Sequence, residues 1–462
     1  MTWDLGQRNV AGSFRLYCVV ARDRMAGCVR PLAFVPSGFS PPIRSRTSPK
    51  THCFAASVQR GFVPQCLDML RILLIFGFVG ILTSTIYLAL VFAATIRFRR
   101  RPKTVPAFTP AVSVLKPLHG AEPGLREFLE GFFQLDYPEY EILFCARYET
   151  DPGLAIAREL SEKYPRVPAR IMTSGEPPWP NAKCYSMNEM KAAARHDILV
   201  ISDSDVRVTP GYLRAVVEPF RDEKTGLVTC VYRGAAKQGG FWARLEGLGM
   251  SVEMTSGVLV AEMLEGMRFA LGPSMVVRKS CVDQIGGFEG LRDYYADDFM
   301  LGRLVAESGS AVVLSDHVID HCIVNTKFKK SLGHQWSWMK STRFSRPMGH
   351  LGTGLTFGLP FGLLVLVTAI MMGQPWVGLA ALAWTAAARV VQSVLVGWYV
   401  VKDRDALRLA WLYPLRDLIG SLLWMASYAS RRVGWRDDFF ELRKRGLARL
   451  IPAEERRVNA HQ

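Results

Sequence analysis

Several signatures that would fix a functional class are absent from this sequence. The chain has no CxxC pair, and its nine cysteines are scattered and odd in number, which argues against the disulfide framework of a secreted domain and favours reduced thiols facing the cytosol. GxSxG, a Walker-type glycine loop and HExxH are also missing, so these hydrolase and nucleotide-binding motifs give no lead. The N-terminus has no charged start followed by an apolar core and a cleavage site, and no secretory signal is predicted.

Positive charge, in contrast, is abundant. A net charge of +16 would ordinarily favour a nucleic-acid partner. However, basic runs at residues 97–103 and 431–436 flank long apolar segments, as the positive-inside rule and attraction to anionic lipid require. We therefore expect a membrane partner and no nucleic acid.

The N-terminal part divides into two segments. Residues 1–68 show no helical or strand periodicity, and we interpret them as disordered or as an extension created by a misplaced start codon, with Met69 the true start. Residues 69–104 contain an uncharged run at 72–96 that is long enough to cross a bilayer. The arginines after this anchor place the following domain in the cytosol.

Residues 105–326 alternate between short β-rich runs and helical stretches. The β-rich runs are AVSVLKPL, YEILFCAR, ARIMT, DILVISDSD and GLVTCVYR, and helical spacing is found in GLREFLEGFFQL and GLAIARELSEKY. This alternation predicts an α/β fold with a mostly parallel sheet. Ligands of such sheets bind beyond the carboxyl ends of the strands, so site residues are expected at that edge.

The C-terminal third returns to membrane-like composition. Residues 327–352 mix cations with tryptophans in the style of an interfacial amphipathic helix. Residues 353–430 hold three apolar windows, at 354–373, 377–401 and 409–430, and the first two predict a transmembrane hairpin.

The third apolar window is ambiguous because it contains Pro414, Arg416 and Asp417. It is either re-entrant or interfacial, or it crosses the bilayer against the positive-inside rule. Residues 431–462 are predicted to be a basic cytosolic tail. The chain would then be a multi-pass protein of the inner or cytoplasmic membrane.

Two carboxylates, Asp203 and Asp205, follow the apolar run HDILVI. In a loop at the mouth of the sheet both can approach one divalent cation, Mg²⁺ or Mn²⁺, and the cation can neutralise a diphosphate. A solvated strand end or an Asx turn is the alternative interpretation.

Other carboxylates occupy similar positions. Asp151 follows another β-rich run, at the same sheet edge as Asp203 if the two strands are parallel. Asp298 precedes a helical stretch and could accept a proton from a hydroxyl, with its pKa tuned by Asp297 and by burial. The alternative is that it is an N-cap.

Two further patterns allow a functional and a structural interpretation. Residues 241–267 form a helical pattern with four methionines, which suits either a lipid groove or core packing, and core packing is favoured. His317 and His321 lie four residues apart in a stretch that resembles strands, so ordinary polar strand residues are favoured over a metal site.

A family resemblance follows from motifs in one order. VSVLKPLHG, FFQLDYPEYEILF, NAKCYSMNEM, DSDVRV, YYADDFMLG and HQWSWMKSTR resemble the ceramide glucosyltransferase family, whose close bacterial relatives include the hopanoid-associated glycosyltransferases. The resemblance covers about residues 112–344 and implies a GT-A fold, an αβα sandwich that binds a nucleotide sugar, within residues 105–326.

The resemblance also implies residue roles. Asp151 resembles the first acidic residue of the family, Asp203 the second, and Asp298, beside Asp297, the third and catalytic base. Lys183 matches a lysine near the sugar donor.

The last motif departs from the family pattern. The family has arginine immediately before tryptophan, but here Ser337 precedes Trp338 and His334 begins the motif. If a cation must steady the departing diphosphate, Lys340 or Arg343 would have to replace the missing guanidinium; alternatively, the motif has lost that role.

Taken with the membrane segments, the resemblance implies a membrane-bound inverting glycosyltransferase. It would move one sugar, glucose or N-acetylglucosamine, from a UDP-sugar donor to the hydroxyl of a lipid acceptor, ceramide-like or hopanoid, with a divalent metal as cofactor. The alternatives are a processive polysaccharide synthase and a catalytically silent lipid-binding scaffold. Few membrane segments follow the domain, which disfavours the synthase.

Overall fold

The structure, a computed structural model, describes residues 50–102, 107–236, 239–323, 327–435, 438–452 and 455. By its contacts the chain divides into two units, residues 1–60 and the larger unit of residues 61–462. The disorder predicted for residues 1–49 lies outside the described residues. Residues 50–68 belong to helix α1 (Lys50–Arg99), although the sequence predicts disorder there; a helix propagates beyond an apolar core at little cost per residue.

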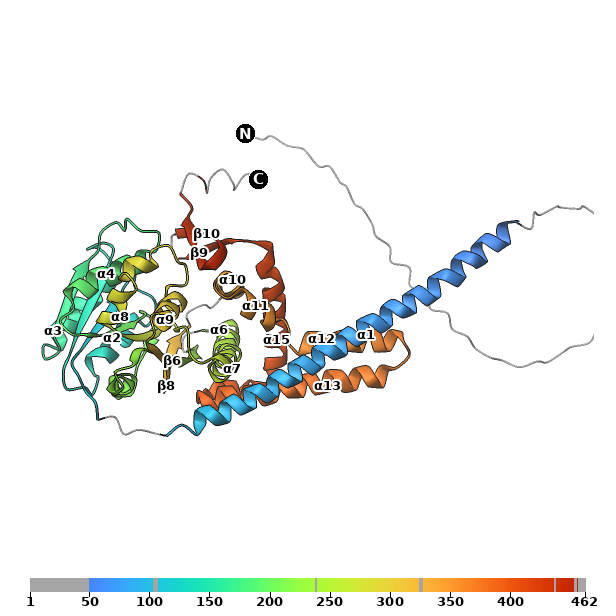
Figure 1. Ribbon diagram of the computed structural model, residues 1–462, viewed down its shortest axis with the longest axis horizontal. Coiled ribbons are helices and arrows are strands. Elements are labelled where there is room, and N and C mark those ends of the chain that lie inside the picture. Colours follow the sequence, from blue (N-terminus) through green and yellow to red (C-terminus); the bar gives the residue numbers. More distant parts are fainter. Residues whose placement is uncertain are drawn as a thin grey trace, which may run out of the picture. The chain divides into compact units, whose positions relative to one another are not determined.

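A mixed eight-stranded sheet has the strand order β3-β2-β1-β4-β7-β6-β8-β5. It lies in the globular part of the larger unit, at the left of Figure 1. The strands are β1 (Val112–Pro117), β2 (Tyr140–Ala146), β3 (Ala169–Thr173), β4 (Ile198–Ser202), β5 (Val206–Arg207), β6 (Thr225–Ala235), β7 (Ser274–Arg278) and β8 (Ala311–Cys322). β5 and β7 run opposite to the other strands. All five predicted β-rich runs are strands. The predicted α/β fold with a mostly parallel sheet is confirmed, with β5 and β7 as the antiparallel strands.

Both faces of this sheet are covered. Every residue of β2 and of β4 is buried, and a strand buried on both faces needs a layer of structure on each side. Helices that lie between these strands in the chain include α2 (Leu125–Phe133), α3 (Pro152–Lys163), α4 (Ala182–Ala193), α5 (Tyr212–Val217), α8 (Lys279–Gln284) and α9 (Asp297–Glu307). Because β1 to β4 are parallel, the loops after them share one edge.

The methionine-rich stretch is one continuous helical rod that packs on β6. It consists of α6 (Phe241–Leu248), the π-helical segment η2 (Gly249–Met254) and α7 (Thr255–Glu265). A Cβ on Gly234 would lie 2.4 Å from the Cα of Gly247, so glycine lets helix and strand meet backbone to backbone. Met250 and Met267 are buried in the main core, which confirms core packing for these two.

Two helices in the described part of the chain are long and apolar enough to cross a membrane, Leu67–Arg99 and Pro375–Val400. The second comprises α13 (Pro375–Gln392) and a π-helical continuation, η4 (Ser393–Val400). The shorter apolar helix α12 (Leu359–Met371) forms a hairpin with α13 and lies against α1 (Figure 1).

The third apolar window folds as the short helix α15 (Tyr413–Ala426), which runs across the ends of α12 and α13 in Figure 1. Its charges are buried in ion pairs. Asp417 lies 3.4 Å from Arg389 of α13 and accepts the backbone N–H groups of Gly358 and Leu359, while Arg389 donates to Ser84 of α1. These contacts explain how an apolar window tolerates charged side chains.

The segment predicted to be interfacial is the packed helix α10 (Phe328–Ser345), followed by α11 (Pro347–Thr353). α10 contacts α6, α15 and strand β9. Its buried residues are polar: Ser331, Gln335, Lys340 and Ser345.

The predicted basic tail contains a second sheet. Its strands β9 (Arg432–Trp435), β10 (Asp438–Leu442) and β11 (Ala448–Leu450) are antiparallel. Val433, Phe440, Leu442 and Ala448 form its core, and Tyr295 of the main domain packs against them. This sheet was not predicted, because its strands are short and arginines dominate the composition of the segment.

Candidate functional site

A largely buried lysine, Lys183, joins two of the predicted acidic residues. Lys183 lies near the start of α4, with Nζ 2.7 Å from Asp203 Oδ1 and 3.6 Å from Asp297 Oδ2. Burial alone would lower the pKa of Lys183, but the Asp203 and Asp297 charges hold that pKa above its usual value. The side chain is therefore a fixed cation between the end of β4 and the start of α9.

The turn that carries Asp203 is anchored by Lys116 of β1. The Lys116 Nζ donates to the Asp203 carbonyl oxygen at 2.5 Å and lies 4.1 Å from the centre of the Phe132 ring. Lys116 is fully buried, and burial lowers its pKa to about 7. Lys116 was not predicted as a site residue, although a lysine within an otherwise apolar strand is a usable signal.

The second acid of the DSD motif faces β8. Asp205 Oδ2 lies 3.1 Å from His321 Nε2. Burial lowers and Asp205 raises the pKa of His321, and the net shift is upward. The prediction that His317 and His321 are strand residues is confirmed, since both lie on β8.

Asp298 is an acid with a raised pKa that is held by two backbone N–H groups. Its Oδ2 accepts the Gly272 N–H at 2.8 Å and its Oδ1 accepts the Phe299 N–H at 2.7 Å. A Cβ on Gly272 would lie 2.9 Å from Asp298 Oδ2, so glycine permits this close contact. Burial, and then the Asp297 charge, raise the pKa of Asp298 to about 6, a value suited to accepting a proton near neutral pH.

Asp151 lies at the same edge of the sheet, and its carboxylate accepts hydrogen bonds from two backbone N–H groups. It caps α3 by accepting the Gly153 N–H at 2.7 Å, and it accepts the Gly120 N–H at 2.8 Å. Asp151 thereby fastens the loop after β2 to the loop after β1. Its predicted contact with the sugar donor stays a prediction.

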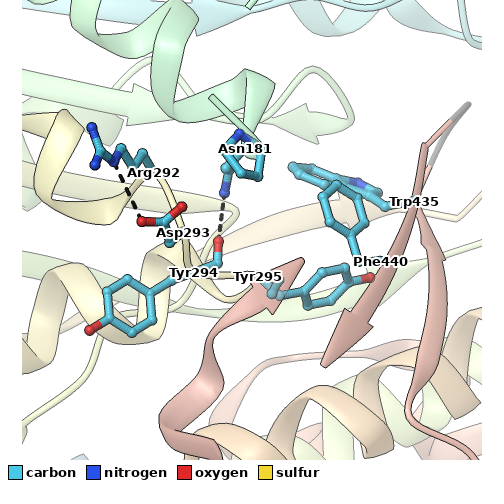
Figure 2. Close-up of a pocket in the computed structure, with 9 residues that line it drawn as sticks. Asn181, Arg292, Asp293, Tyr294, Tyr295, Trp435 and Phe440 are labelled. Atoms are coloured by element: carbon cyan, nitrogen blue, oxygen red, sulfur yellow. Dashed lines mark hydrogen bonds and ion pairs between the residues drawn. The ribbon is translucent and has the colours of Figure 1, made fainter. Parts of the chain in front are cut away.

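Figure 2 shows how the loop before Asp297 is held. Asn181 caps α4 through Oδ1, which accepts the Cys184 N–H at 3.1 Å, and its Nδ2 donates to the Tyr294 carbonyl oxygen at 3.0 Å. On the other side Tyr295 meets the rings of Trp435 and Phe440 edge to face. Asn181 and the C-terminal sheet therefore fix the segment that leads to both carboxylates of α9.

The predicted residues of α10 separate into two groups. Trp338 lies beside two histidines: its ring centre is 6.3 Å from that of His321, which pairs with Asp205, and 4.2 Å from that of His334. Lys340 instead donates to the Arg432 carbonyl oxygen, and Arg343 donates to that of Ser427 at 2.7 Å. In this structure neither cation contacts the acidic cluster.

The two carboxylates after β4, Asp203 and Asp205, supply some of the oxygen ligands that a hard divalent cation needs. Among the described residues no group of three or more His, Cys, Asp or Glu side chains has the arrangement of a metal site. Mg²⁺, however, is usually held by one or two carboxylates together with substrate phosphates, and Asp203 and Asp205, with side chains 30% and 27% exposed, offer that donor set. The two carboxylates thus fit a cation that arrives with a phosphorylated substrate.

Comparison with known proteins gives consistent matches. A model of glycosyl transferase family 21 matches residues 75–448. Ceramide glucosyltransferase 1 of Caenorhabditis elegans is 32% identical over 222 residues, which are 48% of this chain and 47% of that protein. Ceramide glucosyltransferase of Komagataella phaffii is 36% identical over 124 residues, 26% of this chain and 24% of that one. The chain thus spans about half or less of the length of these relatives.

Among solved structures, a mannosyltransferase from Pyrobaculum calidifontis in complex with GDP-Man and Mn²⁺ matches with a TM-score of 0.43 and 18% identity. The match covers 75% of this chain and 98% of that one.

Proposed function

The chain belongs to glycosyl transferase family 21, and from this membership we propose that it transfers one sugar from a UDP-sugar to the hydroxyl of a membrane lipid, with inversion at the anomeric carbon. The family match and the curated relatives confirm the resemblance to ceramide glucosyltransferases. The proposal extends to a GT-A type fold, glucose or N-acetylglucosamine as the sugar, and a ceramide-like or hopanoid acceptor.

The observation that carries the proposal is the acid cluster around Lys183. Asp203, Asp297 and Asp298 come from two elements distant in sequence, and Asp298 is partly buried with a pKa of about 6. A single displacement needs a base on one face of the sugar and stabilisation of a leaving group on the other. Asp298 supplies the base, and Lys183 holds Asp203 and Asp297 in place without competing for the proton.

In the proposed mechanism the acceptor hydroxyl binds with its oxygen beside Asp298, which removes its proton as the oxygen attacks the anomeric carbon. Asp203 and Asp205 would hold a divalent cation, which when bound supplies positive charge against the diphosphate. Lys116 keeps the Asp203 turn in place during the reaction, because a rigid site needs no reorganisation when charge develops.

The membrane setting supports a lipid acceptor. Two described helices can cross a bilayer, and α15 and the α12–α13 hairpin connect to the catalytic sheet through α6, η2 and α10. We propose an integral membrane protein of the inner or cytoplasmic membrane, with the catalytic domain in the cytosol.

The experiment is a transfer assay on purified membranes, with radiolabelled UDP-glucose and UDP-N-acetylglucosamine, ceramide and hopanoid acceptors, and Mg²⁺ or Mn²⁺. One labelled lipid with inverted configuration supports the proposal. A growing polymer indicates a processive synthase. If no acceptor is labelled, and Asp298→Asn behaves like the parent, the protein is a silent scaffold.

A further inference from the structure

The surface of helix α15 has the reverse of the usual polarity. Its buried residues include four polar or small ones, Arg416, Asp417, Gly420 and Ser421. Its large exposed residues are apolar, namely Leu415, Leu422 and Met425, and Trp411, just before the helix, is 69% exposed. Their spacings of four, seven and three residues place them on one side of the helix. A helix at a protein–water surface buries its apolar side chains and exposes its polar ones, so this exposed side suits hydrocarbon rather than water.

Ion pairs hold the polar side of α15 against the protein. Arg416 Nη2 lies 3.1 Å from Glu253 Oε2 of η2, and Asp417 pairs with Arg389 of α13. A Cβ on Gly249 would lie 2.4 Å from Arg416 Nε, so glycine on η2 makes room for the guanidinium. Rotation of α15 about its axis would break both pairs, and the apolar side is therefore fixed outward.

Helix α11 adds apolar side chains beside α15. Trp424 of α15 donates from Nε1 to the His350 carbonyl oxygen at 2.7 Å, and Met348 and Leu351 of α11 are exposed. The exposed apolar side chains of the two helices are here called the α11–α15 face: Met348, Leu351, Trp411, Leu415, Leu422 and Met425. An exposed apolar surface of this kind marks a contact with a membrane or a partner.

Both ends of α15 lie on the side of the catalytic domain. The chain after α15 forms the C-terminal sheet, in which the Ala448 N–H donates to the Asp293 carbonyl oxygen at 2.8 Å. A helix that crossed the bilayer would separate β11 from this loop. With 14 residues, α15 is about 21 Å long, whereas the hydrocarbon core of a bilayer is about 30 Å thick. The contacts therefore favour an interfacial helix over a crossing one.

Exposed arginines flank the α11–α15 face. Arg404 and Arg408 lie before α15 and Arg431 and Arg432 lie after it, and all four are exposed. Cations at both ends of an apolar surface match a leaflet of anionic phospholipid, which offers acyl chains to the apolar side chains and phosphate groups to the guanidinium groups. A second copy of this chain, with its net charge of +16, is a poorer match for these arginines.

We propose that α11 and α15 lie in the interfacial region of the cytosolic leaflet, with the α11–α15 face against the acyl chains and the flanking arginines on anionic head groups. The inference rests on the membrane setting of the proposed function and goes beyond the sugar transfer itself. Arg416 joins α15 to Glu253 of η2, and the next residue, Met254, accepts a hydrogen bond from Tyr232 of β6 at 2.7 Å. The leaflet would thereby fix the height of the catalytic sheet above the membrane surface.

The test measures the emission of Trp411 in full-length protein in nanodiscs of phosphatidylcholine and phosphatidylglycerol. Subtracting the spectrum of Trp411→Phe from that of the parent isolates this emission, and phenylalanine keeps an apolar ring at the position. Lipids brominated on their acyl chains should quench about half of it, because an interfacial helix buries its apolar face about 5–10 Å deep. Aqueous iodide should quench little. The matched control is Trp179→Phe, since Trp179 packs on Tyr185 in the catalytic domain; the emission of Trp179 should not respond to brominated lipid.

A comparison of head groups tests the arginines. At the same low mole fraction, brominated phosphatidylglycerol should quench Trp411 about twofold more strongly than brominated phosphatidylcholine, because Arg404 and Arg408 concentrate the anionic lipid nearby. Replacing both arginines by glutamine should make the two brominated lipids equally effective.

The outcomes separate the two proposals. Quenching by iodide and not by brominated lipid would place the α11–α15 face in water and overturn the inference. Quenching by neither would also overturn it, because protein, such as a second copy of the chain, would then cover the face. Equal quenching of the parent by the two brominated lipids would overturn the anionic partner. Sugar transfer is assayed in the same nanodiscs, and a parent that transfers no sugar while brominated lipid quenches Trp411 contradicts the proposed function and supports the inference.

Discussion

Asp298 lies beside Asp297 and Lys183, and these two neighbours act on its pKa in opposite directions. Burial and the Asp297 charge raise the pKa, while Lys183 and the Phe299 N–H lower it, and the result is about 6. A base must be ionised to accept a proton, so Asp298 is competent above pH 6 and increasingly protonated below it. Its proposed role therefore has a consequence for the pH dependence of the rate.

Replacing Asp298 by asparagine should lower kcat by about 10²- to 10⁴-fold, since the base is removed while its shape is kept. For the parent, kcat should rise with pH through about 6 and then level off. Both are measured by initial rates between pH 4.5 and 8 with saturating donor and acceptor. Asp283→Asn, which alters an exposed carboxylate paired with Lys191, is the matched control and should leave the profile unchanged.

The neighbours of Asp298 should move this profile in opposite directions. Asp297→Asn removes a like charge, so the acidic limb should shift to lower pH, whereas Lys183→Met removes an opposite charge and should shift the limb to higher pH. The measurement is the pH at half-maximal kcat. A limb that stays at the parent position in both variants would assign it to a different group.

At the scale of single elements, α4 and α9 are tied together by Asn181. This side chain is buried, caps α4 and donates to the carbonyl of Tyr294, three residues before Asp297. It therefore sets the distance between Lys183 on one helix and the carboxylates on the other. In the NAK motif the sequence predicts a role for the lysine, and the structure gives the asparagine an equally clear positioning role.

Two variants of Asn181 separate its role as the N-cap of α4 from its hydrogen bond to the Tyr294 carbonyl oxygen. Asn181→Asp keeps an N-cap acceptor but cannot donate to Tyr294, so kcat should fall about tenfold with little change in stability. Asn181→Ala loses both contacts and should in addition lose about 1 kcal/mol of stability. Activity and melting temperature are measured in the same detergent, and equal kcat values for Asn181→Asp and the parent would remove the positioning role.

The helices near the membrane offer a second test at this scale, the Arg389–Asp417 pair between α13 and α15. Both side chains are almost fully buried, so removing either one leaves an uncompensated charge at a cost of about 3–5 kcal/mol. Arg389→Met and Asp417→Leu should each lower the melting temperature strongly, and the double variant should recover much of the loss. A double variant as unstable as the sum of the single variants would show that the pair is not coupled.

Across the chain as a whole, helices and strands with periodic apolar residues could be predicted from the sequence. Elements that are placed by contacts between distant residues could not. The apolar runs of β1 to β4 and of the long helices carry their own periodicity, so these elements and the acids after β4 were predictable. β7 is short, and its position in the sheet depends on hydrogen bonds to β4 and β6. Glu246 Oε1 lies 2.8 Å from His334 Nδ1, although the two residues are 88 positions apart. No local sequence pattern predicts such a contact.

The C-terminal sheet is the clearest case of a distant segment completing the site. Leu447 bridges to Tyr294, the Ala448 N–H donates to the Asp293 carbonyl oxygen, and Phe440 packs on Tyr295. A segment beyond the last apolar helix thus supports the loop that positions Asp297 and Asp298. The function of the catalytic domain should therefore depend on residues outside the predicted range 105–326.

Adjacent phenylalanines of β10 test this dependence. Phe440 is 3% exposed in the core of the small sheet, and Phe439 is 46% exposed on the other face of the strand. Phe440→Ala should destabilise the packing of the small sheet by about 3–5 kcal/mol and loosen Tyr295. We therefore expect kcat to fall at least tenfold. Phe439→Ala should change kcat less than threefold. Initial rates, together with protease cleavage in the C-terminal segment, report function and local unfolding separately. If Phe440→Ala opens the sheet to protease while kcat is retained, the sheet only covers the domain, and the loop before Asp297 is held by Asn181 alone.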